Sequence, residues 1–518
     1  MSGYRPSKES LARHAVPEWF DDAKFGIFIH WGLFAIPAFA PRQDGVARAI
    51  SNNYALSAVM TPYTEWYDNA VRVPESPSAT HHAERYGDRP YTDFKADFEA
   101  GLEHWDARQW ARLFRRSGAR YVVLVTKHHD GFCLWPSTVD NPRRPDWHTR
   151  RDIVGELAAA VRDEELRFGV YYSGGIDWSF NSNPVRTLVQ FFGSTPAGDY
   201  PAYAEAQVRE LIQRYRPSIL WNDISWPTAL KPMLQVIADY YEAVPEGVVN
   251  DRWMHQGLAL KLLRLRPVQR LLDGWLERRL RKDALAGRST DGIVPPVPAH
   301  FDFRTPEYTS FDSTTADKWE ATRGMTASFG FNQGDREEHY EDKTELVRSF
   351  IDTVSKNGNL LLNVGPRGED ASIPDPQRER LECIGDWLDA NGEAIYGTRP
   401  WQQSEGSTRC GVPIRFACAK RSGQASAATG CERVVYAIVM GPTTGREISI
   451  DLPESIHCDA NARRLADNRT FSSRVDETPT GKLLSITLDE PLATAPAHAF
   501  AIGYDELTED VAPVSTKR

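Results

Sequence analysis

Two acidic residues in this 518-residue chain stand where a carboxyl group could take part in catalysis. Asp223 follows the apolar run 218–221 and Asn222, at the end of a predicted strand. Glu307 lies in segment 301–308, whose aromatic residues favour the protonated carboxyl that a general acid requires. Hydrolysis of a glycosidic bond needs two such carboxyl groups, one to protonate the leaving oxygen and one to attack carbon or activate water. Taken alone, Asp223 could also be a helix N-cap and Glu307 a solvated loop residue.

Residues able to bind sugar hydroxyls follow other apolar runs. His128 and His129 are adjacent, so on an extended backbone they point to opposite sides and one should face the strand ends. Neutral imidazole both donates and accepts hydrogen bonds. His30 closes another run, and Glu65 with Trp66 combines a carboxylate with an aromatic face. A metal site is the rival interpretation of the histidine pair, but no third ligand with a characteristic spacing accompanies it. His30 could also be structural, and residues 65–66 an ordinary loop.

Short apolar runs alternate with amphipathic stretches through the first four hundred residues. Such runs are typical of buried parallel strands, and this alternation predicts an α/β fold with a (β/α)8-like, TIM-type barrel. The predicted strands are 26–30, 121–126, 167–172, 218–221, 247–250, 326–331 and 359–363. The predicted helices are 106–116, 152–165, 203–215 and 343–356, the last ending at the stop signal Asn357-Gly358.

Polar or reactive residues stand at the C-terminal end of each of these predicted strands. Barrel enzymes carry their catalytic residues at that end, so the pattern predicts an active site there. The strand-end residues are His30, residues 128–130, residues 171–173, Asn222, Asp223, Asp251, Arg252, Asn332 and Asn363.

A different pattern begins near residue 400. Residues 414–420, 433–440, 447–452, 483–488 and 499–504 resemble strands separated by polar turns, which predicts an antiparallel β-sandwich. The expected domains are therefore a catalytic barrel, residues 1–398, and a C-terminal β-sandwich, residues 399–518. Six cysteines are too few for a disulfide framework, although one bridge after residue 400 stays open.

A Leu- and Arg-rich segment at about residues 254–299 interrupts the barrel pattern. It is amphipathic, basic and broken at Pro267, which predicts a helical insert made of two helices. It could be a packed excursion or a subunit contact in a homo-oligomer. It could also be a lid over the substrate entrance, or a surface element that binds anionic lipid.

Composition excludes some classes of protein. A formal net charge of −10 gives no basic face for nucleic acid. No apolar run of about 18 residues is present, so no transmembrane segment is expected. The first fifteen residues lack the apolar region of a secretory signal, which leads us to expect a cytoplasmic protein.

Taken together, these segments resemble glycoside hydrolase family 29, the α-L-fucosidases. The resemblance runs from about residue 17 to residue 400 and more loosely beyond. Its motifs appear in order at residues 19–32, 64–67, 127–132, 170–173, 220–223, 250–253, 305–308, 328–330 and 355–366.

The resemblance implies a barrel with a C-terminal β-sandwich, no cofactor and retaining hydrolysis of terminal α-L-fucosyl linkages. A fucosylated oligosaccharide or glycoconjugate would be the substrate. Asp223 would attack the anomeric carbon, and Glu307 would act as acid and then as base. The residues implied to surround the fucose are His30, Glu65, Trp66, His128, His129, Tyr171, Trp221, Arg252 and Phe329, the last against the C6 methyl group.

The insert is the main departure from the family pattern, because it separates Arg252 from Glu307. Glu320, Glu337, Glu338 and Glu341 are therefore alternative candidates for the acid/base. Two other functions stay open. One is hydrolysis of a related L-sugar, such as an α-L-galactoside, in the same pocket. The other is a carbohydrate-binding protein without catalysis, against which the presence of both carboxylates argues.

Overall fold

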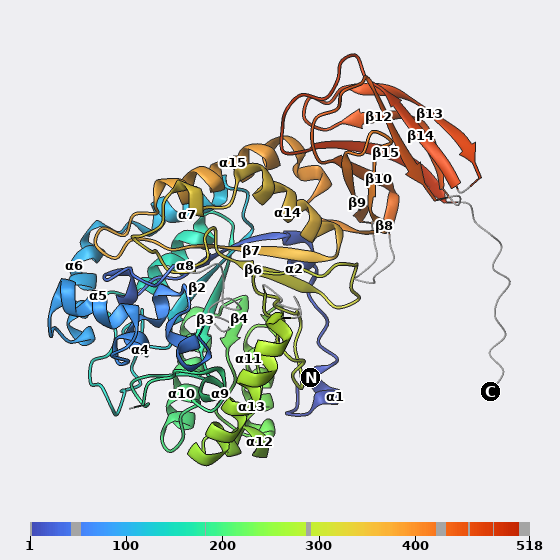
Figure 1. Cartoon of the computed structure of the whole chain (residues 1–518). Helices are drawn as coiled ribbons and strands as arrows, with labels where there is room; N and C mark the ends of the chain where they lie inside the picture. The colour runs from blue at the N-terminus through green and yellow to red at the C-terminus, as the bar shows by residue number, and fades with distance from the viewer. Residues whose placement is uncertain are drawn as a thin grey trace, which may run out of the picture. The chain divides into compact units, whose positions relative to one another are not determined.

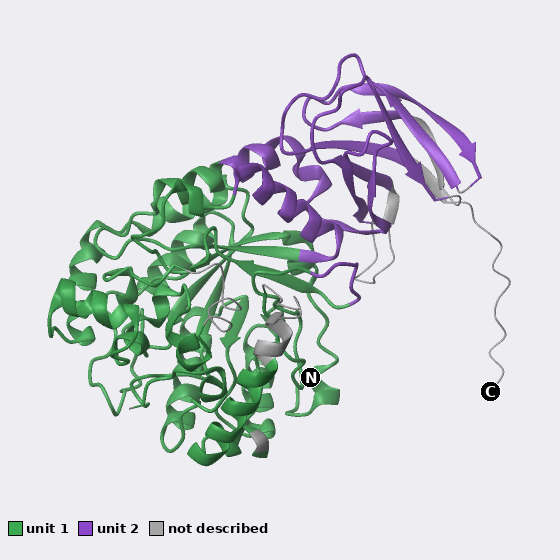
Figure 2. Ribbon diagram, in the orientation of Figure 1, with its two compact units in different colours: residues 1–310, 317–341, 359–382 green, residues 311–316, 342–358, 383–518 purple. Residues whose placement is uncertain are grey.

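The computed structural model describes residues 3–42, 53–181, 183–285, 292–420, 431–453, 456–479 and 481–506. The chain divides into two compact units, shown in Figure 2. Unit 1 comprises Met1–Ser310, Asp317–Glu341 and Asn359–Glu382. Unit 2 comprises Phe311–Ala316, Asp342–Gly358 and Cys383–Arg518. The domain boundary expected at residues 398 and 399 stays a prediction.

A seven-stranded sheet forms the centre of unit 1, with strand order β5-β4-β3-β2-β1-β7-β6 (Figure 1). Its members from β5 to β7 pair in parallel. Every residue of β1, β2, β4 and β7 is buried, which explains their continuous apolar runs. The strands are β1 (Phe25–Ile29), β2 (Tyr121–Lys127), β3 (Arg167–Ser173), β4 (Ile219–Asp223), β5 (Val248–Val249), β6 (Trp319–Arg323) and β7 (Gly358–Val364).

An irregular segment, residues 302–307, closes the gap between β5 and β6. Phe303 forms a parallel bridge with Asn250, just after β5, and Arg304 forms another with Trp319 in β6. Glu307 extends the pairing with β6 through a further parallel bridge to Thr322. This segment takes the place of an eighth barrel strand, and it carries Glu307.

Helices lie on the outside of the sheet, as Figure 1 shows for α7, α8, α10 and α11. Aspartates cap two of the predicted helices: the Asp106 side chain accepts from two backbone N–H groups of α7, and the Asp152 side chain accepts from Gly155 N of α8. The predicted stop after α14 is confirmed, since Asn357 has a φ of 74°. The helices are α1 (Lys8–Leu11), α2 (Glu18–Ala23), α4 (Tyr67–Val71), α5 (Pro77–Tyr86), α6 (Phe94–Gly101), α7 (Ala107–Arg116), α8 (Ile153–Asp163), α9 (Leu188–Phe192), α10 (Tyr200–Tyr215), α11 (Leu230–Ala243), α12 (Leu258–Leu262), α13 (Arg266–Leu285), α14 (Lys343–Ser355) and α15 (Asp375–Asn391).

One predicted barrel strand is wrong. Residues 326–331 form bends, and the strand in this part of the chain is β6, which ends just before them. Strand β6 shows no continuous apolar run, because Glu320 in its middle is a charged residue type that is buried in the barrel interior. The Glu320 carboxylate accepts hydrogen bonds from Tyr121 Oη at 2.6 Å and Trp221 Nε1 at 3.3 Å. Asn332, expected at a strand end, instead forms part of a turn by accepting from Gly334 N.

In the described part of the segment between Arg252 and Phe303, the chain forms two helices, α12 and α13. Pro267 is the second residue of α13, where the missing N–H of proline costs no helical hydrogen bond. Helix α13 packs against α9, and Asp273 accepts a hydrogen bond from Tyr54 Oη at 2.7 Å. Several apolar side chains of this insert remain exposed, among them Leu258, Leu271 and Trp275.

Unit 2 contains an eight-stranded antiparallel sheet, with order β11-β14-β13-β12-β15-β10-β9-β8. A bridge between Thr408 and Ile450 connects the end of β8 to the other edge strand, β11, so the sheet folds over an apolar core. Cys418 in that core is disulfide-bonded, the bridge that the sequence left open. The strands are β8 (Thr398–Ser407), β9 (Pro413–Lys420), β10 (Cys431–Val439), β11 (Glu447–Leu452), β12 (Ile456–Arg464), β13 (Thr470–Thr478), β14 (Gly481–Thr487) and β15 (His498–Glu506).

The five strands that the sequence predicted in this unit are present, as β9, β10, β11, β14 and β15. The sequence missed β8, β12 and β13. In β8 and β13 most side chains are exposed or half-buried, so neither strand shows an apolar run.

Candidate active site

The ends of the parallel strands bring the predicted site residues together in unit 1. Tyr171 connects several of them, because its ring lies 5.7 Å from the rings of both His30 and His128 and 5.4 Å from that of Trp221. Eight of the eleven predicted site residues belong to β1–β5, the residues directly after these strands, or the segment after β6, and Glu307 belongs to segment 302–307. The other two, Glu65 and Trp66, come from a short 3-10 helix, Thr64–Trp66.

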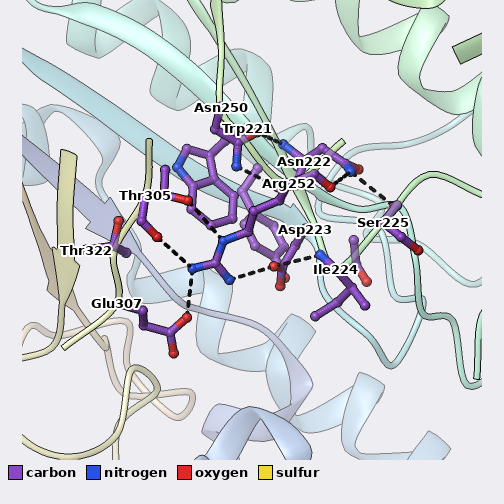
Figure 3. A network of polar contacts seen from close by, with 12 residues as sticks. Trp221, Asn222, Asp223, Ile224, Ser225, Asn250, Arg252, Thr305, Glu307 and Thr322 are labelled. Carbon is purple, nitrogen blue, oxygen red and sulfur yellow. Dashed lines mark hydrogen bonds and ion pairs between the residues drawn. The ribbon is translucent and has the colours of Figure 1, made fainter. Parts of the chain in front are cut away.

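Arg252 joins the two candidate catalytic carboxylates. Its Nη1 donates to Asp223 Oδ1 at 3.0 Å, and its Nη2 donates to Glu307 Oε2 at 2.8 Å (Figure 3). The guanidinium also lies over the Trp221 ring, 4.7 Å from its centroid, and Nε donates to Thr305 Oγ1 at 3.2 Å. Burial lowers the pKa of Arg252, but the charges of Glu307 and Asp223 outweigh that effect and raise it. The arginine is therefore a permanent cation between two acids.

Three donors fix the Asp223 carboxylate. Oδ1 accepts from Arg252 and, at 2.8 Å, from Ile224 N, while Oδ2 accepts from Tyr171 Oη at 2.7 Å. Such charge-assisted bonds are among the stronger ones in proteins. Only 6% of Asp223 is exposed, so a substrate would meet a carboxylate that is already oriented.

Glu307 has a second partner that the sequence did not reveal. Tyr63 Oη donates to Glu307 Oε1 at 2.8 Å. Burial, followed by the charge of Glu307, raises the pKa of Tyr63 well above its usual value, so the phenol keeps its proton and stays a donor. Together with Arg252, it holds both oxygens of the glutamate.

The residue directly after each of these two carboxylates has a left-handed backbone conformation. Ile224, which follows Asp223, has a φ of 69°, and Tyr308, which follows Glu307, has a φ of 50°. A positive φ is rare for residues other than glycine, especially β-branched ones, and costs about 1–3 kcal/mol. Strain of this kind is concentrated at functional sites.

His129 presents a hydrogen-bond acceptor next to Asp223. Ser173 Oγ donates to the carbonyl of Ile176 at 2.7 Å, so at its 2.7 Å contact with His129 Nδ1 the serine oxygen must accept. Burial lowers the pKa of His129 to about 4, so the ring is neutral near pH 7 and its Nε2 carries a lone pair. That Nε2 lies 4.0 Å from Asp223 Oδ2. Two acceptors facing each other suit the hydroxyl of a ligand.

His30 is held in the same way as His129, with Nδ1 bonded to the protein and Nε2 left as an acceptor. Asn363 Nδ2 donates to the carbonyl of Phe329 at 2.5 Å, which turns its Oδ1 towards His30 Nδ1 at 2.6 Å. Burial lowers the pKa of His30 to about 3, so this ring is also neutral, with Nε2 as an acceptor. His128 Nδ1 is buried and has no partner in the described part of the chain.

Phe329, Trp66 and Glu65 surround these histidines. The Phe329 ring stacks on His30 at 4.8 Å and contacts Tyr63 and Tyr308 at 5.6 and 5.2 Å. Trp66 meets the edge of His129 at 5.5 Å. Glu65 accepts from Gly330 N at 3.1 Å, and burial raises its pKa to about 7. The combination of apolar rings, neutral imidazoles and a carboxylate suits a sugar with one apolar edge.

Lys127 holds the histidine segment in position from the outer face of the sheet, where its ammonium lies near Tyr200 and Tyr203 of α10. Its Nζ lies 2.8 Å from Asp177 Oδ2, and both side chains are fully buried. The ammonium also lies 4.3 Å from the centre of the Tyr172 ring. This buried pair anchors the residues directly before His128 and His129.

The alternative acid/base candidates do not contact Asp223 or Arg252 through any described hydrogen bond. Glu320 is inside the barrel, bound by Tyr121 and Trp221. Glu337 and Glu338 are exposed. Glu341 forms an ion pair with Arg323. Of the acidic residues that the sequence singled out for this role, Glu307 alone shares a cation with Asp223 among the described contacts.

A family model described as α-L-fucosidase matches residues 1–271 and 281–393. The chain belongs to the α-L-fucosidase family, glycoside hydrolase family 29. The tissue α-L-fucosidase of Mus musculus is 32% identical over 417 residues, which cover 78% of this chain and 76% of the mouse protein. The tissue α-L-fucosidase of Homo sapiens is 30% identical over 417 residues, 77% of this chain and 73% of the human protein.

Solved structures agree with this family assignment. The α-fucosidase of Thermotoga maritima in complex with a mechanism-based inhibitor is 36% identical, with a TM-score of 0.76, and the alignment covers 96% of this chain and 100% of that one. The predicted α/β barrel followed by a β-sandwich is thereby confirmed for this member of the fucosidase family.

Sequence reasoning on this fucosidase missed the residues that orient the site. Tyr63 directly precedes the motif at residues 64–67, and Asn363 and Ser173 stand at strand ends, but the partners that give these residues their roles are distant in sequence. Within the described ranges, no group of three or more His, Cys, Asp or Glu side chains could hold a metal ion. The same ranges contain no helix long and apolar enough to cross a bilayer.

Proposed function

We propose that this fucosidase cleaves terminal α-L-fucosyl linkages of fucosylated oligosaccharides or glycoconjugates with Asp223 as nucleophile and Glu307 as acid/base. The observation that carries the assignment is the Arg252 guanidinium, which binds one oxygen of each carboxylate. Retention of configuration is general for the family. It requires one carboxylate that attacks carbon and another that transfers a proton.

In the first step, Asp223 forms a bond to the anomeric carbon while the bond to the leaving oxygen breaks. Glu307 gives its proton to that oxygen, so the leaving group departs as an alcohol. In the second step, water attacks the anomeric carbon and gives a proton to Glu307, and the Asp223 carboxylate is released. Two inversions at carbon give net retention.

The surrounding residues would bind and select the sugar. His30 and His129 offer neutral Nε2 acceptors to hydroxyl groups. Tyr171 supports the nucleophile through its hydrogen bond to Oδ2. Phe329 offers an apolar ring to the C6 methyl group of fucose, where a 6-hydroxyl would lose its hydrogen bonds to water. Selectivity against an L-galactoside from one such contact is on the order of 10- to 200-fold.

Azide distinguishes the two catalytic roles through product stereochemistry. We would measure turnover of 4-nitrophenyl α-L-fucoside by the Glu307→Ala and Asp223→Gly variants with and without azide. In Glu307→Ala the nucleophile is intact, so azide should intercept the fucosyl-enzyme and give α-fucosyl azide. In Asp223→Gly azide replaces the nucleophile, so β-fucosyl azide should form. The reverse pattern, or wild-type activity in either variant, would show that the assignment is wrong.

A further inference from the structure

A cavity of about 370 Å³ opens on Glu307 in unit 1. Tyr63 and Glu307 line it, and none of the other ten predicted site residues does. The remaining lining comes from residues 292–293 near the end of the insert, from Tyr308, from Arg323 at the end of β6 and from residues after that strand. Its volume lies in the range of roughly 300–1,000 Å³ that small-molecule sites occupy. The acid/base candidate is thus shared between the carboxylate cluster and a separate, unassigned cavity.

The polar part of this cavity is an ion pair with spare hydrogen-bonding capacity. Arg323 Nη2 contacts Glu341 Oε2, and about a quarter of each side chain is exposed. Arg323 Nε is buried and has no hydrogen-bond partner in the described part of the protein. Buried donors nearly always have a partner, so this N–H points to an acceptor supplied by a ligand. The pair carries no net charge, which favours a neutral ligand over an anion.

The apolar part lies beside that pair. Met325 is 3% exposed, whereas Ile293 is 43% exposed. The backbone N–H of Glu341 donates to the carbonyl of Met325 at 2.9 Å, so the polar and apolar walls are tied together. A pyranose ring has the matching surfaces, since its C–H groups pack on apolar side chains and its hydroxyls accept from arginine and donate to glutamate.

Position relative to Glu307 decides what the cavity binds. A general acid must come within hydrogen-bond reach of the oxygen that it protonates, and that oxygen belongs to the leaving group. Arg252 holds one oxygen of Glu307 towards Asp223, while Tyr63 binds the other and lines the cavity. A ligand in the cavity that contacts Glu307 therefore approaches the acid from a side that is not occupied by the nucleophile.

We propose that this cavity binds the leaving group: a neutral pyranosyl residue, recognised through its hydroxyls by Arg323 and Glu341. The inference rests on the proposed role of Glu307 and adds the substrate class that the enzyme releases. Fucose that is attached to a bare aryl or halide leaving group does not use these contacts.

Comparing two kinds of substrate tests the proposal. We would measure kcat/KM of wild type, Arg323→Met and Glu341→Gln with α-L-fucosyl fluoride, whose leaving group is too small to fill the cavity. We would then use the best wild-type substrate among α-L-fucosyl-galactose and α-L-fucosyl-N-acetylglucosamine disaccharides. Glu338→Gln is the matched control, because Glu338 is exposed near Glu341 but does not line the cavity.

Both cavity variants should lose about 10- to 100-fold in kcat/KM on the disaccharide and keep the wild-type value on the fluoride, as expected for lost hydrogen bonds to charged groups. Retained activity on the fluoride also shows that the variants fold. Equal losses on both substrates, or unchanged values on both, would overturn the leaving-group site. Failure of the wild type to hydrolyse the fluoride would instead overturn the proposed function, and this inference with it.

Discussion

Replacement of Arg252 is the sharpest test of how the two carboxylates are held. The guanidinium is 11% exposed and donates to Asp223 and Glu307 through different nitrogen atoms. Lysine keeps the charge but is a compact point charge that cannot serve both acids in this way. Methionine keeps the apolar stem over Trp221 and removes the cation altogether. Arg252→Lys therefore removes one of the two contacts with the carboxylates, and Arg252→Met removes both.

The expected losses follow from those contacts. A hydrogen bond to a charged group contributes about 1.5–3 kcal/mol. Since about 1.4 kcal/mol corresponds to a tenfold change in rate, Arg252→Lys should lower kcat/KM about 10- to 100-fold. Arg252→Met should lower it about 100- to 10,000-fold, because two contacts disappear and two buried carboxylates are left without a cation.

The assay is kcat/KM with 4-nitrophenyl α-L-fucoside, and Arg304→Lys is the matched control. Arg304 is also largely buried and donates to a carboxylate, that of Asp251 at 2.7 Å, but it touches neither Asp223 nor Glu307. It should therefore lose much less activity than Arg252→Lys. If Arg252→Lys stays within about threefold of wild type, or if both lysine variants lose the same amount, the bridging role of Arg252 is refuted.

Three further predictions concern stability. Lys127→Met should lower the free energy of unfolding by about 3–5 kcal/mol, because Asp177 stays buried without its cation; in urea denaturation the double variant Lys127→Met/Asp177→Asn should be more stable than the single one. In the same assay, the free energy of unfolding of Ile224→Gly should exceed that of Ile224→Ala by about 1 kcal/mol, since φ at this position is positive. Burial lowers the pKa of His30 to about 3, so the neutral ring contributes stability that is lost as pH falls below about 6.5. Relative to wild type, His30→Asn should therefore gain on the order of 1 kcal/mol per pH unit between pH 6.5 and 4, and parallel pH profiles of the two proteins would contradict this.

Apolar patterning predicted the barrel strands wherever burial alone defines a strand. Strands β2 and β7 are buried along their whole length, so their composition identifies them. The sequence did not predict strand β6, because the buried Glu320 in it is stabilised by Tyr121 and Trp221, which lie 199 and 99 residues away in sequence. A polar residue satisfied by distant partners leaves no local signal. The segment that closes the barrel beside β6 was missed for the same reason, since Asp251 binds both Arg304 and Thr305.

The candidate site shows the same limit at the level of single residues. Position at a strand end singled out His30, His128, His129 and Asp223, because parallel strands share one catalytic edge. The importance of Tyr63 depends on Glu307, 244 residues further along the chain. The family resemblance supplied Glu307, which its own neighbours do not distinguish from a loop glutamate. Contacts between distant segments, rather than local composition, complete the site.

The closure of the barrel by residues 302–307 also has an evolutionary consequence. The segment between Arg252 and Phe303, which contains the insert, is held at both ends by neighbouring residues. Asp251, directly before Arg252, accepts hydrogen bonds from Arg304 and Thr305, directly after Phe303. Changes in length between these two anchors leave the catalytic carboxylates where they are, and the entropy of closing a longer loop rises only slowly. Ile293, which lines the cavity beside Glu307, lies within that stretch. The insert can therefore change in sequence and length separately from the catalytic residues. Natural selection or protein engineering can use such changes to alter which sugar the enzyme accepts next to fucose.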